Sequence, residues 1–191
     1  MPITHQARTG KTYHFHAEKN KKGRLHYFFS MSPKGNLAEQ IPEDREAYET
    51  LNGQVLLRRI RPKDIFDREV AAVEAALAKR FKSWQYKAEA KKNILTIHEA
   101  SGGSSDLAAV WGVRLSQSEI DEMSQRFCHY MPIMRFLLVD KAKRRFAPER
   151  YCFRGSVDDW ISIGSPDTIE KLAQTYFKHL GHDSFYELYR F

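Results

Sequence analysis

Cysteine is scarce in this sequence: the 191 residues contain only Cys128 and Cys152. Two isolated cysteines form neither a disulfide framework nor a CxxC metal pair, so we expect both to be reduced core residues. The low content of glycine and proline, 10 and 7 residues, excludes a collagen-like or low-complexity chain. No stretch approaches the roughly 20 apolar residues of a membrane helix. Because the sequence does not start with an apolar leader, we expect a soluble cytoplasmic protein without a membrane partner.

The sequence motifs of several enzyme classes are also missing. There is no GxGxxG, GxSxG or HExxH, which removes the usual signatures of a dinucleotide enzyme, a hydrolase and a zinc module. Gly10-Lys11-Thr12 imitates the end of a phosphate-binding P-loop, but His5 stands where that motif requires glycine. We therefore expect no cofactor and no metal ion, and a binding protein rather than an enzyme.

Positive charge is concentrated in the first half of the sequence. The net charge is +7, with 19 Lys+Arg against 12 Asp+Glu in residues 1–99 and 12 of each in residues 100–191. This imbalance favours nucleic acid or another polyanion as partner, because each neutralised phosphate releases counterions. The candidate nucleic-acid contacts are Lys21, Lys22, Arg24, Arg58, Arg59, Arg61 and Lys63. We expect the first six to form one positive surface, which ion pairs at Arg58 and Arg59 would contradict. The alternative is that basic hairpin tips are only solvated and keep sheet edges from pairing.

Alternating apolar residues predict two β-hairpins in the first 60 residues. The first spans residues 12–31, with Gly23 in its basic turn. The second pairs residues 46–51 with residues 54–60 around Asn52-Gly53, a dipeptide typical of a type I′ turn.

A helix is predicted over residues 64–81, because apolar residues recur there every three or four positions. Asp64 is its expected N-cap. The apolar stripe, which we expect to pack on the N-terminal sheet, consists of Phe66, Val70, Val73, Leu77 and Phe81. Two strands follow, at residues 84–90 and 94–99, joined by a turn at residues 91–93.

Residues 101–105, Ser-Gly-Gly-Ser-Ser, are the expected seam between two lobes. Ser116 and Glu119 form a capping-box pattern that predicts a helix ending before Pro132. A third hairpin is expected from residues 133–139 and 146–153. Its tip carries Lys141, Lys143, Arg144 and Arg145.

A last helix is predicted to start at Ser165-Pro166 and to end at Gly181. Its buried stripe consists of Ile169, Leu172, Ala173, Tyr176, Phe177 and Leu180. Asp183 is the expected cap of a short final turn.

Strands joined by short turns indicate antiparallel pairing rather than a doubly wound parallel sheet. The expected fold class is α+β, with antiparallel hairpins, about three packed helices and two lobes joined near residues 101–105. We treat residues 1–191 as a single α+β unit with a basic N-terminal lobe, residues 1–100, and a charge-neutral C-terminal lobe, residues 106–191.

Three histidines of the first hairpin are candidate catalytic residues. If the apolar positions face one core, paired residue numbers have an even sum, and His14, His16 and His26 share the opposite face with Glu18. Imidazoles on one face can bind a metal ion or transfer protons. We favour the structural alternative, in which the rings pack on Phe28 or face solvent, because convergence requires the register that pairs His16 with His26.

A second candidate catalytic cluster surrounds the turn at Gly155-Ser156. Asp158 and Asp159 are adjacent carboxylates that could hold a divalent ion, as in nucleases. The neighbouring charged residues are Glu149, Arg150 and Arg154. Ion pairing and helix capping explain the same residues more simply.

The leading hypothesis is a basic binding or accessory protein whose N-terminal lobe contacts nucleic acid. One alternative is a metal-dependent nuclease or other phosphodiester-cleaving enzyme that uses the histidines or aspartates. Another is a protein-interaction subunit without catalysis, in which protein is the partner. Steep salt dependence of nucleic-acid binding distinguishes the first from the last, and metal-dependent turnover identifies the enzyme.

Overall fold

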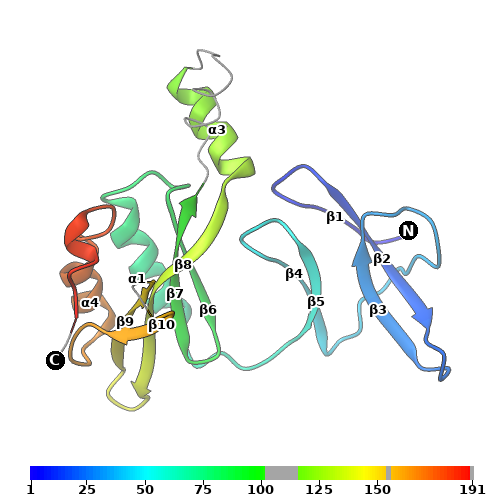
Figure 1. The fold of residues 1–191 in the computed structure, drawn as a ribbon. Coiled ribbons are helices and arrows are strands. Elements are labelled where there is room, and N and C mark those ends of the chain that lie inside the picture. The colour runs from blue at the N-terminus through cyan, green and yellow to red at the C-terminus, as the bar shows by residue number, and fades with distance from the viewer. Residues whose placement is uncertain (102–115, 154–155, 190–191) are drawn as a thin grey trace. The chain divides into compact units, whose positions relative to one another are not determined.

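The structure is a computed structural model that describes residues 1–101, 116–153 and 156–189. In these ranges, ten strands form three antiparallel sheets that are accompanied by three α-helices (Figure 1). The expected α+β class is therefore confirmed. None of the described helices is long and apolar enough to cross a membrane.

Residue contacts divide the chain into two units. Unit 1 comprises residues 1–61 and 102–129, and unit 2 comprises residues 62–101 and 130–191. The chain passes between the two units after Arg61, after Ser101 and after His129. Of the expected seam at residues 101–105, residues 102–105 lie outside the described residues. By sequence, unit 1 has 13 Lys+Arg and 10 Asp+Glu, and unit 2 has 18 and 14. The excess positive charge of the first half of the sequence is thus divided between both units.

Unit 1 contains two small antiparallel sheets. Their strands are β1 (Thr4–Gln6), β2 (Thr12–Lys19) and β3 (Leu25–Ser30) in one, and β4 (Arg45–Glu49) and β5 (Val55–Arg59) in the other. Both expected hairpins are confirmed, and Phe15 pairs with Phe29, an even sum as expected. Phe15 is fully buried, and its ring centroid lies 5.7 Å from that of Tyr27 and 5.0 Å from that of Phe29.

The three hairpin turns of unit 1 share one five-residue form. They span residues 7–11, 20–24 and 50–54, and in each a glycine at the fourth position has a positive φ. The glycine N–H donates to the carbonyl of the first residue, whose own N–H donates to the carbonyl of the fifth. The prediction of a type I′ turn at Asn52-Gly53 is wrong, because a type I′ turn needs a positive φ at both central residues and only Gly53 has one.

Helix α3 (Gln117–Phe127) belongs to unit 1 and begins at the expected capping box. The Glu119 carboxylate accepts from the N–H of Ser116 at 2.8 Å, and the Ser116 hydroxyl accepts from the N–H of Glu119 at 3.4 Å. The helix ends well before Pro132, because the backbone of Cys128 is already extended and leads into the next strand.

Unit 2 is built on a five-stranded sheet. In spatial order its strands are β10 (Asp159–Ser162), β9 (Arg145–Cys152), β8 (His129–Asp140), β7 (Ile94–Ser101) and β6 (Tyr86–Lys91). Helices α1 (Asp67–Ala78) and α4 (Ile169–Tyr176) pack on each other, α1 also on β6 and α4 also on β9. The hairpin of β8 and β9 is as expected, and both cysteines are buried and free.

The apolar stripe predicted for α1 is buried only in part, and in the core of unit 2 rather than against the N-terminal sheet: Val70 and Phe81 are half-buried, and Phe81 lies beyond the end of α1 at Ala78. Val73 and Leu77 belong to the core of unit 2, together with side chains of β7, β8, β9 and α4. Phe66 is 45% exposed, because it precedes the helix, and its ring lies 4.1 Å from the Arg144 guanidinium carbon. The six residues of the stripe predicted for the last helix are buried as expected, but α4 ends at Tyr176, so the predicted helix end at Gly181 is wrong and Phe177 and Leu180 follow the helix.

Both helices of unit 2 begin later than the sequence predicts. The N-cap of α1 is Phe66, whose N–H donates to the Glu69 carboxylate at 2.8 Å, whereas Asp64 binds Lys141. The N-cap of α4 is Thr168 rather than Ser165, because residue 167 still pairs with Phe146 in an isolated β-bridge. The short final turn, η1 (Asp183–Phe185), follows His182 as its cap and buries Phe185.

Candidate nucleic-acid interface

The turn that joins β2 to β3 presents three cations, Lys21, Lys22 and Arg24. Asn20 holds the turn, since its side-chain Oδ1 accepts from the N–H of Lys22 at 2.9 Å and from the N–H of Arg24 at 3.0 Å. Gly23 has a φ of 74°, a conformation that favours glycine, and allows the chain to reverse. The three cationic side chains are exposed and form no ion pair with the described residues. We call this turn, residues 20–24, the basic tip.

The other expected contact residues are mostly neutralised. Arg58 donates from Nε to the Glu46 carboxylate at 2.8 Å, and Arg59 Nε lies 3.9 Å from an Asp44 oxygen. The expectation of one unpaired positive surface is therefore wrong at both arginines. At Arg58 the physical reason is cross-strand pairing, which places Glu46 of β4 directly opposite Arg58 of β5. Arg59 lies opposite Arg45, and its carboxylate neighbour Asp44 directly precedes β4.

Arg61 and Lys63 lie on different units. Arg61 is exposed at the end of the first segment of unit 1 and has no ion pair within the described chain. Lys63 belongs to unit 2, where its Nζ lies 3.4 Å from Asp67.

Three of the four cations in the basic turn between β8 and β9 form ion pairs within unit 2, and only Lys143 is exposed without an ion pair in the described chain. Lys141 Nζ lies 2.7 Å from Asp64, and Arg145 forms an ion pair with Asp167. Arg144 donates to both carboxylate oxygens of Glu69, at 2.8 and 2.5 Å. These three ion pairs tie the turn to the start of α1 and to the segment before α4.

Glu69 is the most buried carboxylate in these pairs, with 5% of its side chain exposed. Burial opposes its ionisation, but the hydrogen bonds and charge of Arg144 and the N–H of Phe66 outweigh burial. The pKa of Glu69 is therefore held below its ordinary value. The pair joins α1 to the turn between β8 and β9, which is a structural role.

The histidines of the first hairpin form a ring stack around Phe28. His16 pairs with Phe28 and His26 with Glu18, so the register needed for two converging imidazoles is not present. The ring centroid of Phe28 lies 5.1 Å from that of His16 and 5.5 Å from that of His26. His14 faces Ser30, further along the hairpin.

His16 is buried, and its Nε2 lies 3.0 Å from the carbonyl oxygen of Ser32. Its Nδ1 has no hydrogen-bond partner in the described chain. Among the described residues, no group of three or more His, Cys, Asp or Glu side chains is placed to hold a metal ion. The arrangement packs aromatic rings rather than focusing nitrogen atoms on one point.

The second candidate cluster is dispersed. Asp158 accepts from the Tyr151 hydroxyl at 3.0 Å, and the Asp159 carboxylate accepts from the N–H of Trp160 at 2.7 Å. Glu149 pairs with Arg135, their closest atoms 2.6 Å apart. Arg154 lies outside the described residues.

Arg150 has a structural role that the sequence did not indicate. It is buried in unit 2, and its guanidinium donates to the carbonyl oxygens of Leu188 at 2.6 Å and Tyr186 at 2.7 Å. These bonds anchor the C-terminal segment on strand β9. Neither this residue nor its acidic neighbours form a catalytic arrangement in the described part of unit 2.

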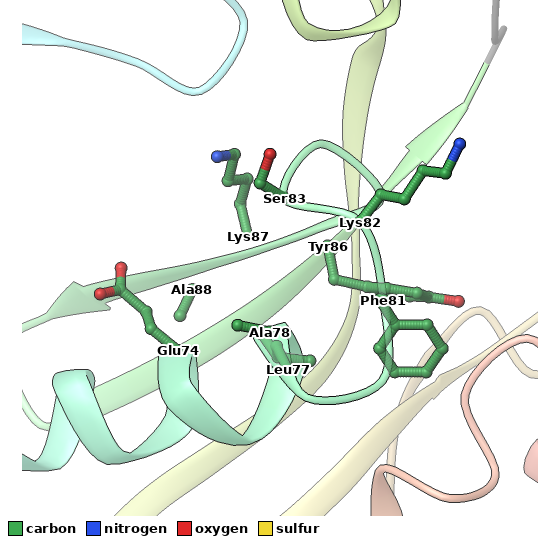
Figure 2. Close-up of a pocket in the computed structure, with 9 residues that line it drawn as sticks. All are labelled: Glu74, Leu77, Ala78, Phe81, Lys82, Ser83, Tyr86, Lys87 and Ala88. Atoms are coloured by element: carbon green, nitrogen blue, oxygen red, sulfur yellow. The ribbon is translucent and has the colours of Figure 1, made fainter. Parts of the chain in front are cut away.

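Unit 2 has a pocket of about 300 Å³ between α1 and β6 (Figure 2). Its lining consists of Glu74, Leu77, Ala78, Phe81, Lys82, Ser83, Tyr86, Lys87 and Ala88. The small side chains of Ala78 and Ala88 leave this space unfilled. Tyr86 donates its hydroxyl to Glu99 at 2.7 Å, and burial together with this carboxylate raises the pKa of Tyr86.

Sequence reasoning did not find this pocket, because a lone alanine on a helix and another on a strand carry no signal that they face one space. Figure 2 shows Lys87 and Ser83 pointing to one side of β6, while Ala88 points toward α1. The polar side chains of Ser83 and Lys87 are therefore not gathered over Ala88. The pocket lacks the convergent polar groups typical of a small-molecule site.

No protein family, curated protein or solved structure matches this chain. The function proposed below is therefore supported by the residues themselves.

Proposed function

We propose that this protein binds nucleic acid through the basic tip of unit 1. The observation that carries the proposal is the contrast between Lys21, Lys22 and Arg24, which are exposed and unpaired within the described chain, and Arg58 and Arg59, which have carboxylate partners. A cation without a carboxylate partner is available to a phosphate, and each such contact releases counterions from the nucleic acid.

The geometry of the tip also supports phosphate binding. Asn20 and Gly23 fix the backbone of the turn, so the cations are held on a preformed loop rather than on a free terminus. Residues 19–24 contain no Asp or Glu that would repel a phosphate. Phosphate contacts of this kind give affinity without sequence preference, so we expect general rather than sequence-specific binding.

The test is fluorescence anisotropy with a labelled 20-nucleotide single strand and the matching duplex. The variant Lys21→Ala/Lys22→Ala/Arg24→Ala is expected to bind about ten-fold or more weakly near 0.1 M salt, because three phosphate contacts are lost. The control is Lys79→Ala/Lys143→Ala/Lys178→Ala, three exposed lysines of unit 2 with the same change in charge. An equal loss in both variants would mean that net charge, not the tip, controls binding.

The same oligonucleotides, incubated with Mg²⁺ or Mn²⁺, test the phosphodiester-cleaving alternative. We expect the strands to remain intact, since the candidate histidines pack on Phe28 and the candidate aspartates are dispersed. Metal-dependent cleavage that His16→Ala abolishes would replace the binding proposal with an enzyme.

A further inference from the structure

Strand β6 is an edge of the five-stranded sheet, and half of its backbone groups face outward. The N–H of Ala100 donates to the carbonyl of Gln85 at 2.8 Å, which fixes the phase of the β6–β7 ladder. Counting in steps of two from Gln85, the backbone N–H and C=O groups of Lys87, Glu89 and Lys91 point toward β7. The backbone groups of the residues between them face the free edge.

These outward-facing residues are Tyr86, Ala88 and Ala90. Within the described chain, no other strand and no loop backbone pairs with them on this side. A row of unpaired N–H and C=O groups is a template for another strand. Proteins usually protect such an edge with charged side chains, especially lysine, and β6 contains Lys87 and Lys91.

The charged row is Lys87, Glu89 and Lys91, which lie on one face of the sheet because side chains alternate along a strand. A glutamate between two lysines does not simply repel another copy. In an antiparallel pair centred on Ala88, Lys87 lies opposite Glu89 of the second copy, and Glu89 lies opposite its Lys87. An antiparallel pair centred on Glu89 would instead place Glu89 opposite Glu89 of the second copy. It would also place Lys87 opposite Lys91 twice, so every charged pair would have like charges.

The hydrogen-bond phase is compatible with this register. An antiparallel pair centred on Ala88 joins Ala88 to Ala88 and Tyr86 to Ala90, and these are the residues whose backbone groups face the edge. The Lys87 and Glu89 pairs then occupy non-hydrogen-bonded positions, where opposite side chains approach most closely. A pair centred on Glu89 would also join outward-facing residues, Ala88 with Ala90, so the charges and not the hydrogen bonds distinguish the two registers.

From the unpaired edge and the charge complementarity of this register, we propose that β6 is a self-association edge: two copies of this chain pair β6 with β6, antiparallel and centred on Ala88. The partner is a second copy of the chain, and the two five-stranded sheets become one continuous sheet of ten strands.

The test is the mass of the full chain in solution, measured by light scattering and analytical ultracentrifugation. The wild type is expected at twice the chain mass of 22.3 kDa. Lys87→Glu and Glu89→Lys each place like charges opposite one another twice, so each is expected to weaken the dimer about ten-fold or more. The double variant Lys87→Glu/Glu89→Lys restores both opposite-charge pairs and is expected to dimerise again.

Mixing the two single variants provides a second test that does not depend on the double variant folding. The Lys87→Glu chain opposite the Glu89→Lys chain has only opposite-charge pairs, so the mixture is expected to form a heterodimer. The control Lys178→Glu, on an exposed residue of unit 2, is expected to leave the dimer unchanged. A monomeric wild type, or single variants that dimerise as the wild type does, would overturn the proposal.

Discussion

The guanidinium of Arg8 donates a hydrogen bond to the carbonyl oxygen of Cys128 at 2.7 Å, joining the first turn of unit 1 to the end of α3. The same guanidinium donates to the carbonyls of Gln125 and Arg126, and its Nε donates to Leu51 at 2.7 Å. The last carbonyls of a helix have no partner within the helix, and a cation there also interacts favourably with the helix dipole. Arg8 thus holds α3 against two hairpin turns.

Replacing Arg8 by alanine is expected to destabilise the protein by about 2–3 kcal/mol, because several charge-assisted hydrogen bonds are lost together. Arg8→Lys is expected to recover little, since one ammonium group cannot reach carbonyls on two segments. Urea unfolding measures the free energy, and amide exchange should show faster exchange in α3. Lys11→Ala, in the same turn, is the control. A loss below about 0.5 kcal/mol for Arg8→Ala would show that the bonds do not hold α3.

Leu77 tests the core of unit 2. It is buried on α1 within the cluster that includes side chains of β7, β8 and α4. Leu77→Ala should cost about 2–5 kcal/mol, because buried methyl groups are removed and a cavity remains. Ala75→Gly on the exposed face of the same helix should cost only about 1 kcal/mol, the difference in helix propensity. Equal losses in denaturant unfolding would mean that the stripe is not the core face.

The pair of Glu69 and Arg144 predicts a pH dependence of stability. The pKa of Glu69 is lowered from its ordinary value of 4.5, so the folded state favours the ionised carboxylate. Its stabilising contribution is complete above about pH 4.5 and disappears as the pH falls through the folded pKa. Glu69→Gln should cost about 2–3 kcal/mol at pH 7, and this cost should shrink below pH 4.5. A cost that stays constant from pH 7 to pH 3 would contradict this account.

Gly53 and Gly23 form a matched pair for the turns of unit 1. Both have a φ of 74°, but a Cβ on Gly53 would lie 2.7 Å from Thr9 Cγ2, whereas a Cβ on Gly23 would meet nothing within 4 Å. Gly23→Ala should therefore cost only the backbone term, about 1–2 kcal/mol. Gly53→Ala should cost more, because the neighbouring turn must also shift. Equal losses of stability in thermal unfolding would contradict the close contact between Gly53 and Thr9.

Local patterns predicted most of the elements of this fold. Alternation located the hairpins, the spacing from Val70 to Phe81 located α1, and Ser116 with Glu119 located the start of α3. These signals succeed because they arise within a few residues of the chain. The prediction of the turn type at Asn52-Gly53 is wrong because the same dipeptide also fits a five-residue turn in which Gly53 is the fourth residue.

Long-range partners could not be predicted in the same way. Arg8 and Cys128 are 120 positions apart, and Arg144 and Glu69 are 75 apart, so no local pattern links them. For this reason the sequence suggested three basic hairpin ends and did not show which ones have carboxylate partners. The same limit explains why α1 was assigned to the N-terminal sheet although it packs on α4.

The salt dependence of nucleic-acid binding tests the central claim most directly. For single strands, the logarithm of the association constant falls with the logarithm of salt concentration by about 0.7 per neutralised phosphate. The variant lacking the Lys21, Lys22 and Arg24 side-chain charges should therefore show a slope shallower than the wild type by about 2. The unit 2 control, with Lys79, Lys143 and Lys178 replaced, should keep the wild-type slope. A basic-tip variant with the wild-type slope, or a wild type that does not bind at low salt, would contradict the account.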